Sequence, residues 1–146
     1  MTDYSCEVCI VGGGLIGCWT ALFLRRRGRS VVLIEKGSVG EQSSGVNFGN
    51  VRLQGRHPSQ YPLSLRSQAI WEKLENHIGE TCEYAAKGHL YLALADRETA
   101  KIEEYAREAR AHSIAIEIMG GNEARRRWPW LGPAVRAASF SARDAT

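Results

Sequence analysis

The chain has 146 residues, of which 44% are hydrophobic and 24% are charged. This balance is typical of a globular protein, excludes a disordered chain, and allows one ordinary domain with its own core. The net charge of +3 comes from 19 basic and 16 acidic residues, a surplus too small to indicate nucleic-acid binding. We therefore expect no nucleic-acid partner.

The four cysteines of the chain are Cys6, Cys9, Cys18 and Cys82. Cys6 and Cys9 form a C-x-x-C pair, but they fall in a predicted strand, where residues three apart point to opposite faces. No second C-x-x-C or C-x-x-H pair follows that would complete a tetrahedral zinc site. We therefore expect no metal site and no redox pair. We interpret the cysteines as small buried hydrophobes in a reducing, cytoplasmic compartment.

An apolar stretch, Val8–Leu24, lies close to the amino terminus. It is shorter than the roughly 20 residues that span a membrane, and glycines interrupt it. Its flanks also differ from those of a signal peptide, because Asp3 and Glu7 precede it and arginines 25–27 follow it. We therefore predict that the stretch belongs to the fold and that this chain has no membrane span.

Three segments at the start of the chain predict a strand, a helix and a second strand. Cys6–Val11 is a short apolar run, typical of a buried parallel strand, and it stops at Gly12. Leu15–Arg27 has apolar residues at helical spacing, and Gly28 follows where a helix commonly ends. Val31–Ile34 is a second buried run. Together these segments predict a βαβ unit and an α/β fold.

The composition changes after this unit. A loop rich in Gly, Ser and Asn is predicted over residues 37–55, and loops of that length are usually functional. We then expect, in chain order, a helix over 62–78, one or two strands over 84–95, a helix over 97–112, a strand over 114–118, and a helix capped by Asn122.

The order of these later elements predicts the start of a second, mixed α+β domain. We place the boundary between residues 1–79 and residues 80–146. Two credible parallel strands are fewer than a doubly wound sheet needs. We therefore expect an incomplete, N-terminal fragment of a larger protein.

The segment between the first strand and its helix reads GGGLIG over residues 12–17, which fits the G-x-G-x-x-G pattern of dinucleotide-binding proteins. In that pattern Gly12 permits the tight turn, Gly14 lets the backbone approach a pyrophosphate, and Gly17 lets the helix pack closely on the strand. The N–H groups at the start of the helix then face the phosphates. Because a strand precedes the glycines and a helix follows them, the context favours a phosphate-binding turn.

The second strand leads into Glu35, close to the interval of about 20 residues at which this pattern places an acid. A carboxylate there accepts hydrogen bonds from ribose hydroxyls and repels a 2′-phosphate, so the pattern disfavours NADP. FAD and NAD both stay open on these residues alone, as does a glycine-rich turn with no ligand.

Four stretches carry a resemblance to a known family. They read CIVGGGLIGCWTALFLRRRGRSVVLIEKG from Cys9, QYPLSLRSQAIWEKL from Gln60, KGHLYLA from Lys87 and NEARRRWP from Asn122. In this order they resemble the amino-terminal part of the D-amino-acid oxidase superfamily of flavoenzymes. Its members include glycine oxidase, sarcosine oxidase and D-amino-acid dehydrogenase. The resemblance spans nearly the whole chain and favours FAD over NAD.

The resemblance also implies which residues bind FAD. The glycines would hold the pyrophosphate, Glu35 would hold the adenosine ribose, and the loop after residue 42 would follow the pyrophosphate and the ribityl chain toward the flavin ring. The implied cofactor-binding residues are Gly12, Gly14, Leu15, Ile16, Gly17, Glu35, Lys36, Ser43, Ser44, Gly45, Asn47 and Gly49.

Two arginines are the candidate catalytic residues. Arg52 matches an arginine near the flavin in sarcosine oxidase-like members. A second family arginine, nearer the substrate carboxylate, falls at Gly55 or Arg56, because this chain carries one extra residue. The alternative interpretation of Arg52 and Arg56 is that both are solvated loop residues.

The resemblance implies an FAD-dependent oxidoreductase that oxidises the C–N bond of a small amino acid or secondary amine by hydride transfer to the flavin. The flavin carries out the redox chemistry, and the protein supplies orientation and a positive clamp for the carboxylate. Oxygen and a respiratory electron acceptor are both open as the final oxidant.

Two alternatives belong to other classes. The chain could be a catalytically silent fragment or a binding-only dinucleotide module, since much of the family's substrate pocket lies beyond the matched region. A flavin dehydrogenase of the glycerol-3-phosphate type is the other enzyme alternative, and a preference for substrates without a carboxylate would distinguish it.

Overall fold

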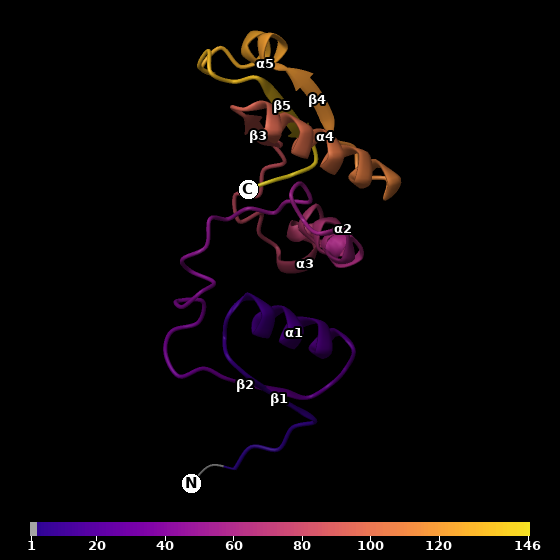
Figure 1. Cartoon of the computed structure of the whole chain (residues 1–146). Coiled ribbons are helices and arrows are strands. Elements are labelled where there is room, and N and C mark those ends of the chain that lie inside the picture. The colour runs from indigo at the N-terminus through magenta and orange to yellow at the C-terminus, as the bar shows by residue number, and fades with distance from the viewer. Residues whose placement is uncertain (1–2) are drawn as a thin grey trace. The chain divides into compact units, whose positions relative to one another are not determined.

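The computed structural model describes residues 3–146, which form two compact units (Figure 1). The first unit ends at Phe48 and the second begins at Gly49. The functional division expected between residues 1–79 and 80–146 stays a prediction, because compactness does not report what each part binds.

The first unit is a βαβ unit. It consists of β1 (Val8–Val11), α1 (Leu15–Arg26) and β2 (Val31–Ile34), and the two strands pair in parallel with Val8 opposite Val31. The predicted strand, helix and second strand are therefore confirmed. The first strand is shorter than predicted, and the helix ends one residue earlier.

Glycines form both turns of this unit. Gly12 has a φ of +106°, which favours glycine, and its N–H donates to the carbonyl of Ile34 at 2.8 Å. Gly28 has a φ of +77° just after α1, and the N–H of Arg29 donates to the Leu24 carbonyl at 3.1 Å. The second turn satisfies a carbonyl at the helix end, as glycine-terminated helices commonly do.

The expectation that the cysteines are buried is wrong for two of them. Cys9 and Cys82 are exposed, whereas Cys6 and Cys18 are half-buried, and all four are free thiols. Cys9 lies on the two-stranded sheet of the first unit, which α1 contacts, and the neighbouring Val11 is 85% exposed. Periodicity identified the strand correctly but did not show how little of it would be covered.

The second unit contains a three-stranded antiparallel sheet in the order β3-β5-β4. Its strands are β3 (His89–Ala93), β5 (Ala137–Ser141) and β4 (Glu117–Gly120). The helix α4 (Asp96–Ala111) contacts all three strands. The other helices are the 3-10 turn η1 (Pro58–Gln60), α2 (Tyr61–Trp71), α3 (Leu74–Ile78) and α5 (Gly121–Arg127). The predicted mixed α+β section is confirmed.

Two clusters of buried side chains form the core of the second unit. The first joins α4 to the loop before η1 and comprises Leu53, Tyr61, Ala106, Ala109, Ile114 and Ile116. The second lies around α5 and the sheet and comprises Met119, Ala124, Leu131, Val135 and Ala138. Because Leu53 is a core residue, the backbone beside Arg52 is fixed by hydrophobic packing.

The single helix expected over residues 62–78 is wrong. The structure has α2 and α3, separated at Glu72 and Lys73. The buried residues of α2 are Tyr61 and Gln68, which lie on one helical face, whereas Leu63 is 74% exposed. The face of α2 that packs against the rest of the unit therefore differs from the apolar face predicted from the sequence.

Two smaller expectations also need correction. The strand expected over 114–118 begins only at Glu117, because Ile114 and Ile116 are buried in the first core cluster as loop residues. Residues 84–95 contain one strand, β3, which agrees with the one or two strands expected there. Asn122 lies inside α5, whose N-cap is Gly120, and its side chain accepts a hydrogen bond from Arg125.

Candidate functional site

The glycine turn of the first unit brings strand, helix and loop into close contact. A Cβ atom on Gly17 would lie 1.9 Å from the carbonyl oxygen of Gly12, so the helix could not approach the strand with any larger residue. A Cβ on Gly14 would lie 2.9 Å from the Ser44 hydroxyl oxygen. Gly17 is therefore required by the local backbone geometry, whereas a side chain at Gly14 would displace the Ser44 hydroxyl.

Glu35 clamps this turn from the end of β2. Its carboxylate accepts hydrogen bonds from the N–H of Gly13 at 2.7 Å and from the N–H of Gly37 at 2.9 Å. These two backbone donors, Gly13 first, lower the pKa of the Glu35 carboxyl, and the charge of Lys36 adds a smaller effect in the same direction. The group is therefore an anion at neutral pH.

The loop after β2 returns to the start of α1. The Ser44 hydroxyl accepts a hydrogen bond from the N–H of Leu15 at 2.9 Å, and the Asn47 side chain donates to the Ser44 carbonyl. Gly45 is also required, because a Cβ there would lie 2.6 Å from the Gly40 carbonyl oxygen. The structure thus brings Ser44, Gly45 and Asn47 together at the glycine turn, as the predicted site requires.

The residues at this turn fit an FAD pyrophosphate and ribose. The first N–H groups of α1 have no partner within the helix, its first turn carries no acidic residue, and Ile16 is 86% exposed there. Each oxygen of Glu35 accepts one backbone N–H and keeps further lone pairs for a ribose hydroxyl. The glycines of residues 12–17 carry no side chain that would cover the backbone N–H groups of the turn. Lys36 and Ser43 are exposed beside these residues.

The second unit contains the predicted arginines. Arg52 Nη1 donates to the carbonyl of Gln54 at 2.7 Å and to the hydroxyl of Tyr91 at 3.3 Å. Arg56 Nε donates to the carbonyl of Arg52 at 3.5 Å. Gly55 has a φ of +78°, and a Cβ there would lie 2.6 Å from Arg52 Nη1, so the structure disfavours a side chain at this position. The structure brings Arg52 and Arg56 together, and both are half-buried.

A buried polar group that the sequence did not indicate supports this loop. Asp144 is 0% exposed, and its carboxylate accepts the N–H of Leu53 at 2.8 Å and the N–H of Gln54 at 3.0 Å. Gln54 is also fully buried, and its side chain donates to the carbonyl of His89 at 2.9 Å. No local pattern marks Asp144, because its partners lie 91 and 90 residues earlier in the chain.

His89 contacts Gln54 and is affected by the charges of Asp144 and Arg52. Burial lowers the pKa of the His89 imidazole, the Asp144 carboxylate opposes that shift, and the Arg52 guanidinium reinforces it. The imidazole Nδ1 is 3.1 Å from the side-chain nitrogen of Gln54, and the ring packs edge-on against Tyr91 at 5.1 Å between centroids. The histidine is therefore neutral at pH 7.

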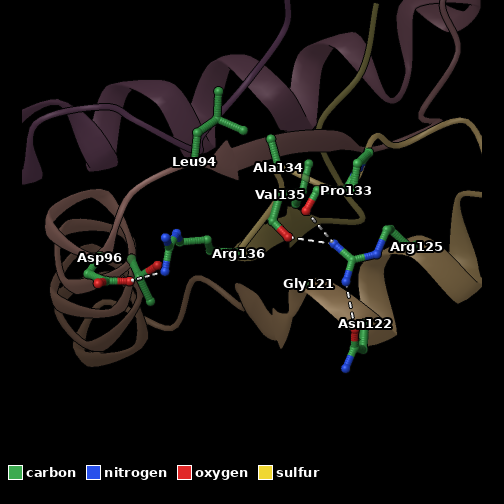
Figure 2. Close-up of a pocket in the computed structure, with 10 residues that line it drawn as sticks. Leu94, Asp96, Gly121, Asn122, Arg125, Pro133, Ala134, Val135 and Arg136 are labelled. Atoms are coloured by element: carbon green, nitrogen blue, oxygen red, sulfur yellow. Dashed lines mark hydrogen bonds and ion pairs between the residues drawn. The ribbon is translucent and has the colours of Figure 1, made fainter.

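A separate cavity of about 670 Å³ is lined by the start of α4, by α5 and by residues 133–136 (Figure 2). Arg125 donates to the carbonyls of Pro133 and Val135, and Arg136 forms an ion pair with Asp96 at 3.0 Å. Its lining residues are Leu94, Asp96, Thr99, Gly121, Asn122, Arg125, Pro133, Ala134, Val135 and Arg136. The predicted site residues do not line this cavity.

Two further observations concern residues 3–146 only. No group of three or more His, Cys, Asp or Glu side chains in this range is placed to hold a metal ion. No helix formed by these residues is both long enough and apolar enough to cross a membrane.

Comparison with known proteins gives consistent matches. The chain is 27% identical over 129 residues to monomeric sarcosine oxidase of Bacillus sp. (strain B-0618), covering 86% of this chain and 32% of that protein. It is 26% identical over 131 residues to N-methyl-L-tryptophan oxidase of Yersinia pestis (strain Pestoides F), covering 87% and 34%. The crystal structure of glycine oxidase from Geobacillus kaustophilus matches with a TM-score of 0.87 at 26% identity, covering 99% and 41%.

These matches show how much of its relatives the chain covers and to which family it belongs. The chain spans about a third of the length of the curated relatives it matches. The family described as FAD dependent oxidoreductase (DAO) matches residues 7–146, which include the glycine turn, Glu35, the two arginines and Asp144. The chain therefore belongs to the DAO family of FAD-dependent oxidoreductases.

Proposed function

We propose that the complete protein is an FAD-dependent oxidoreductase that oxidises the C–N bond of a small amino acid or secondary amine. The observation that carries this proposal is the clamp of Glu35 on the N–H of Gly13, within a βαβ unit of a chain that the FAD-dependent family matches over residues 7–146. The names of the relatives point to the substrate class, because sarcosine, glycine and N-methyl-L-tryptophan are all amino acids.

Within this proposal the first unit binds the cofactor. The glycine turn and the start of α1 hold the pyrophosphate through backbone N–H groups, and Glu35 accepts hydrogen bonds from the ribose. Ser44, Gly45 and Asn47 shape the adjoining loop. Bound FAD supplies the acceptor for a hydride from the substrate α-carbon.

Arg52 and Arg56 bind and orient the substrate carboxylate. A guanidinium presents planar pairs of N–H donors that match a carboxylate, and it stays charged at every working pH. Holding the carboxylate fixes the orientation of the substrate α-carbon, and such orientation accounts for a large part of catalysis in two-reactant systems. Residues 49–60 contain no Asp or Glu that would compete with a substrate carboxylate for these guanidinium groups.

The test is the visible absorption spectrum of the purified complete protein, followed by anaerobic addition of amino acids and amines. We expect a bound flavin spectrum that sarcosine, glycine or a D-amino acid bleaches. The matched variant Gly14→Val should purify without flavin, since its side chain fills the turn. A colourless wild-type protein, or a flavin that no amino acid or amine reduces, would contradict the proposal.

A second candidate is a binding-only module, in which the glycine turn and Glu35 hold the dinucleotide but no substrate is oxidised. The same experiment separates the two, because a binding-only module retains flavin that no substrate reduces. We also infer a cytoplasmic location, since exposed free thiols such as Cys9 persist in reducing compartments. Oxygen or a respiratory acceptor would reoxidise the flavin, and following oxygen consumption distinguishes them.

A further inference from the structure

Asp144 is a buried carboxylate whose oxygens are both used by the loop that carries Arg52. One oxygen accepts the N–H of Leu53 at 2.8 Å and the other accepts the N–H of Gln54 at 3.0 Å. A fully buried carboxylate is costly unless hydrogen bonds compensate it, and here two adjacent backbone donors do so. The pairing therefore fixes the backbone of two consecutive residues.

Gln54 transmits this constraint to Arg52. The peptide N–H of Gln54 is held by Asp144, and its carbonyl oxygen accepts the hydrogen bond from Arg52 Nη1 at 2.7 Å. Its buried side chain donates to the carbonyl of His89 at 2.9 Å, which fixes the same residue to β3. The position of the Arg52 guanidinium thus depends on a residue that Asp144 holds in place.

Neighbouring contacts restrict the loop on either side of Gln54. Val51 and Ala145 exchange two backbone hydrogen bonds of 2.9 and 2.8 Å, and the Tyr105 hydroxyl donates to the Leu53 carbonyl at 3.0 Å. Within residues 3–146, the side-chain hydrogen bonds of Arg52 run through Nη1. Its Nε and Nη2 form the edge that a carboxylate engages through two parallel hydrogen bonds.

We propose that Asp144 is a positioning residue for Arg52, which it orients through the Gln54 peptide so that the guanidinium edge receives the substrate carboxylate. This inference rests on the proposed function, because it assigns Asp144 a part in the carboxylate binding described there. Asp144 does not itself touch the substrate.

The test uses the complete flavin-loaded protein and two variants. Asp144→Asn replaces one acceptor oxygen with an NH₂ group that faces a backbone N–H, and Asp144→Glu keeps both acceptors but displaces them by one methylene. We expect the KM for the amino-acid substrate to rise about tenfold or more in Asp144→Asn, with kcat within about threefold. Asp144→Glu should fall between this variant and wild type. Asp96→Asn, at an exposed ion pair, should behave as wild type.

A double variant distinguishes positioning from general destabilisation. In an Arg52→Lys background, Asp144→Asn should produce little further rise in KM, because both changes act on one interaction. If the rise in KM of the double variant equals the product of the rises in the two single variants, the inference is overturned. So would an Asp144→Glu protein that folds and keeps the wild-type KM.

A measurement on the wild-type protein covers the case in which the variants fail to fold. Binding of acetate as a carboxylate probe should slow hydrogen exchange at the amides of Leu53 and Gln54, because coupling between two sites is reciprocal. Bound acetate without any change at these amides would overturn the inference. A wild-type protein that neither oxidises amino acids nor binds acetate would instead overturn the proposed function.

Discussion

The N–H of Gly13 and the carboxylate of Glu35 are joined by a hydrogen bond of 2.7 Å, which ties the turn after β1 to the residue that follows β2. The same carboxylate accepts the N–H of Gly37, so one side chain organises both the glycine turn and the start of the following loop. Cofactor affinity should therefore depend on Glu35 in two ways, through the ribose contact and through the shape of the turn.

Replacing Glu35 with alanine should weaken FAD binding by tenfold or more, which corresponds to the loss of about one charge-assisted hydrogen bond. Titration of the apoprotein with FAD, followed by flavin fluorescence, measures the dissociation constant. Glu41→Ala is the matched control, because Glu41 accepts only a longer hydrogen bond of 3.3 Å from the Ser38 N–H. Equal losses in the two variants would contradict the assigned role.

Gly17→Ala should destabilise the fold by more than about 2 kcal/mol, because the new Cβ collides with backbone that cannot move independently. The contact is with the Gly12 carbonyl, 1.9 Å from the ideal Cβ position. Chemical denaturation followed by circular dichroism gives the free energy of unfolding. Gly120→Ala places its Cβ in open space and should change stability by no more than about 0.5 kcal/mol.

Ser44→Ala should remove the hydroxyl that accepts the N–H of Leu15 at the start of α1. We expect a loss of about 1 kcal/mol in unfolding free energy, the usual cost of removing an acceptor at a helix N-terminus. Ser43→Ala is the control, since no hydrogen bond of the Ser43 side chain is found in the described part of the chain. A larger loss of unfolding free energy in Ser43→Ala than in Ser44→Ala would contradict the stabilising role assigned to the Ser44 hydroxyl.

The stability of the second unit should fall as the pH decreases through about 6.5. The folded-state pKa of His89 is lowered by burial, so the unfolded chain takes up a proton at a higher pH than the folded one. Stability is then full above the unfolded-state pKa and is lost as the pH falls toward the folded-state value. Denaturation of wild type and His89→Gln between pH 5 and 8 tests this, and the same pH slope in both proteins would exclude His89 as its source.

The part of the fold that the sequence predicted correctly is the part governed by local signals. In residues 8–34, apolar runs, helical spacing and glycine turns all act within a few positions of one another, and β1, α1 and β2 appear where expected. The strand β5 was not anticipated, because its sequence AASFS has small residues and no alternation between apolar and polar positions. It is central in the sheet only because β3 and β4 pair with it.

The candidate site also contains residues that local sequence signals identify and residues that they do not. The glycines and Glu35 could be identified from spacing, because the motif describes a single βαβ unit. Asp144 could not, since a buried carboxylate has no local signature and its partners are far away in sequence. The extended helix over 62–78 failed for a related reason: the side chains that pack, Tyr61 and Gln68, do not form an apolar pattern.

The distance in sequence between Asp144 and its partners has a consequence for synthesis on the ribosome. Residues 51–54 are synthesised about 90 residues before residues 144 and 145. The loop that carries Arg52 therefore cannot form these contacts until the later residues have been added. Closing such a distant contact is slow compared with forming the βαβ unit, whose strands are adjacent in the chain. The nascent protein should therefore form its glycine turn first, and complete the loop that carries Arg52 only after β5 and the residues beyond it have left the exit tunnel.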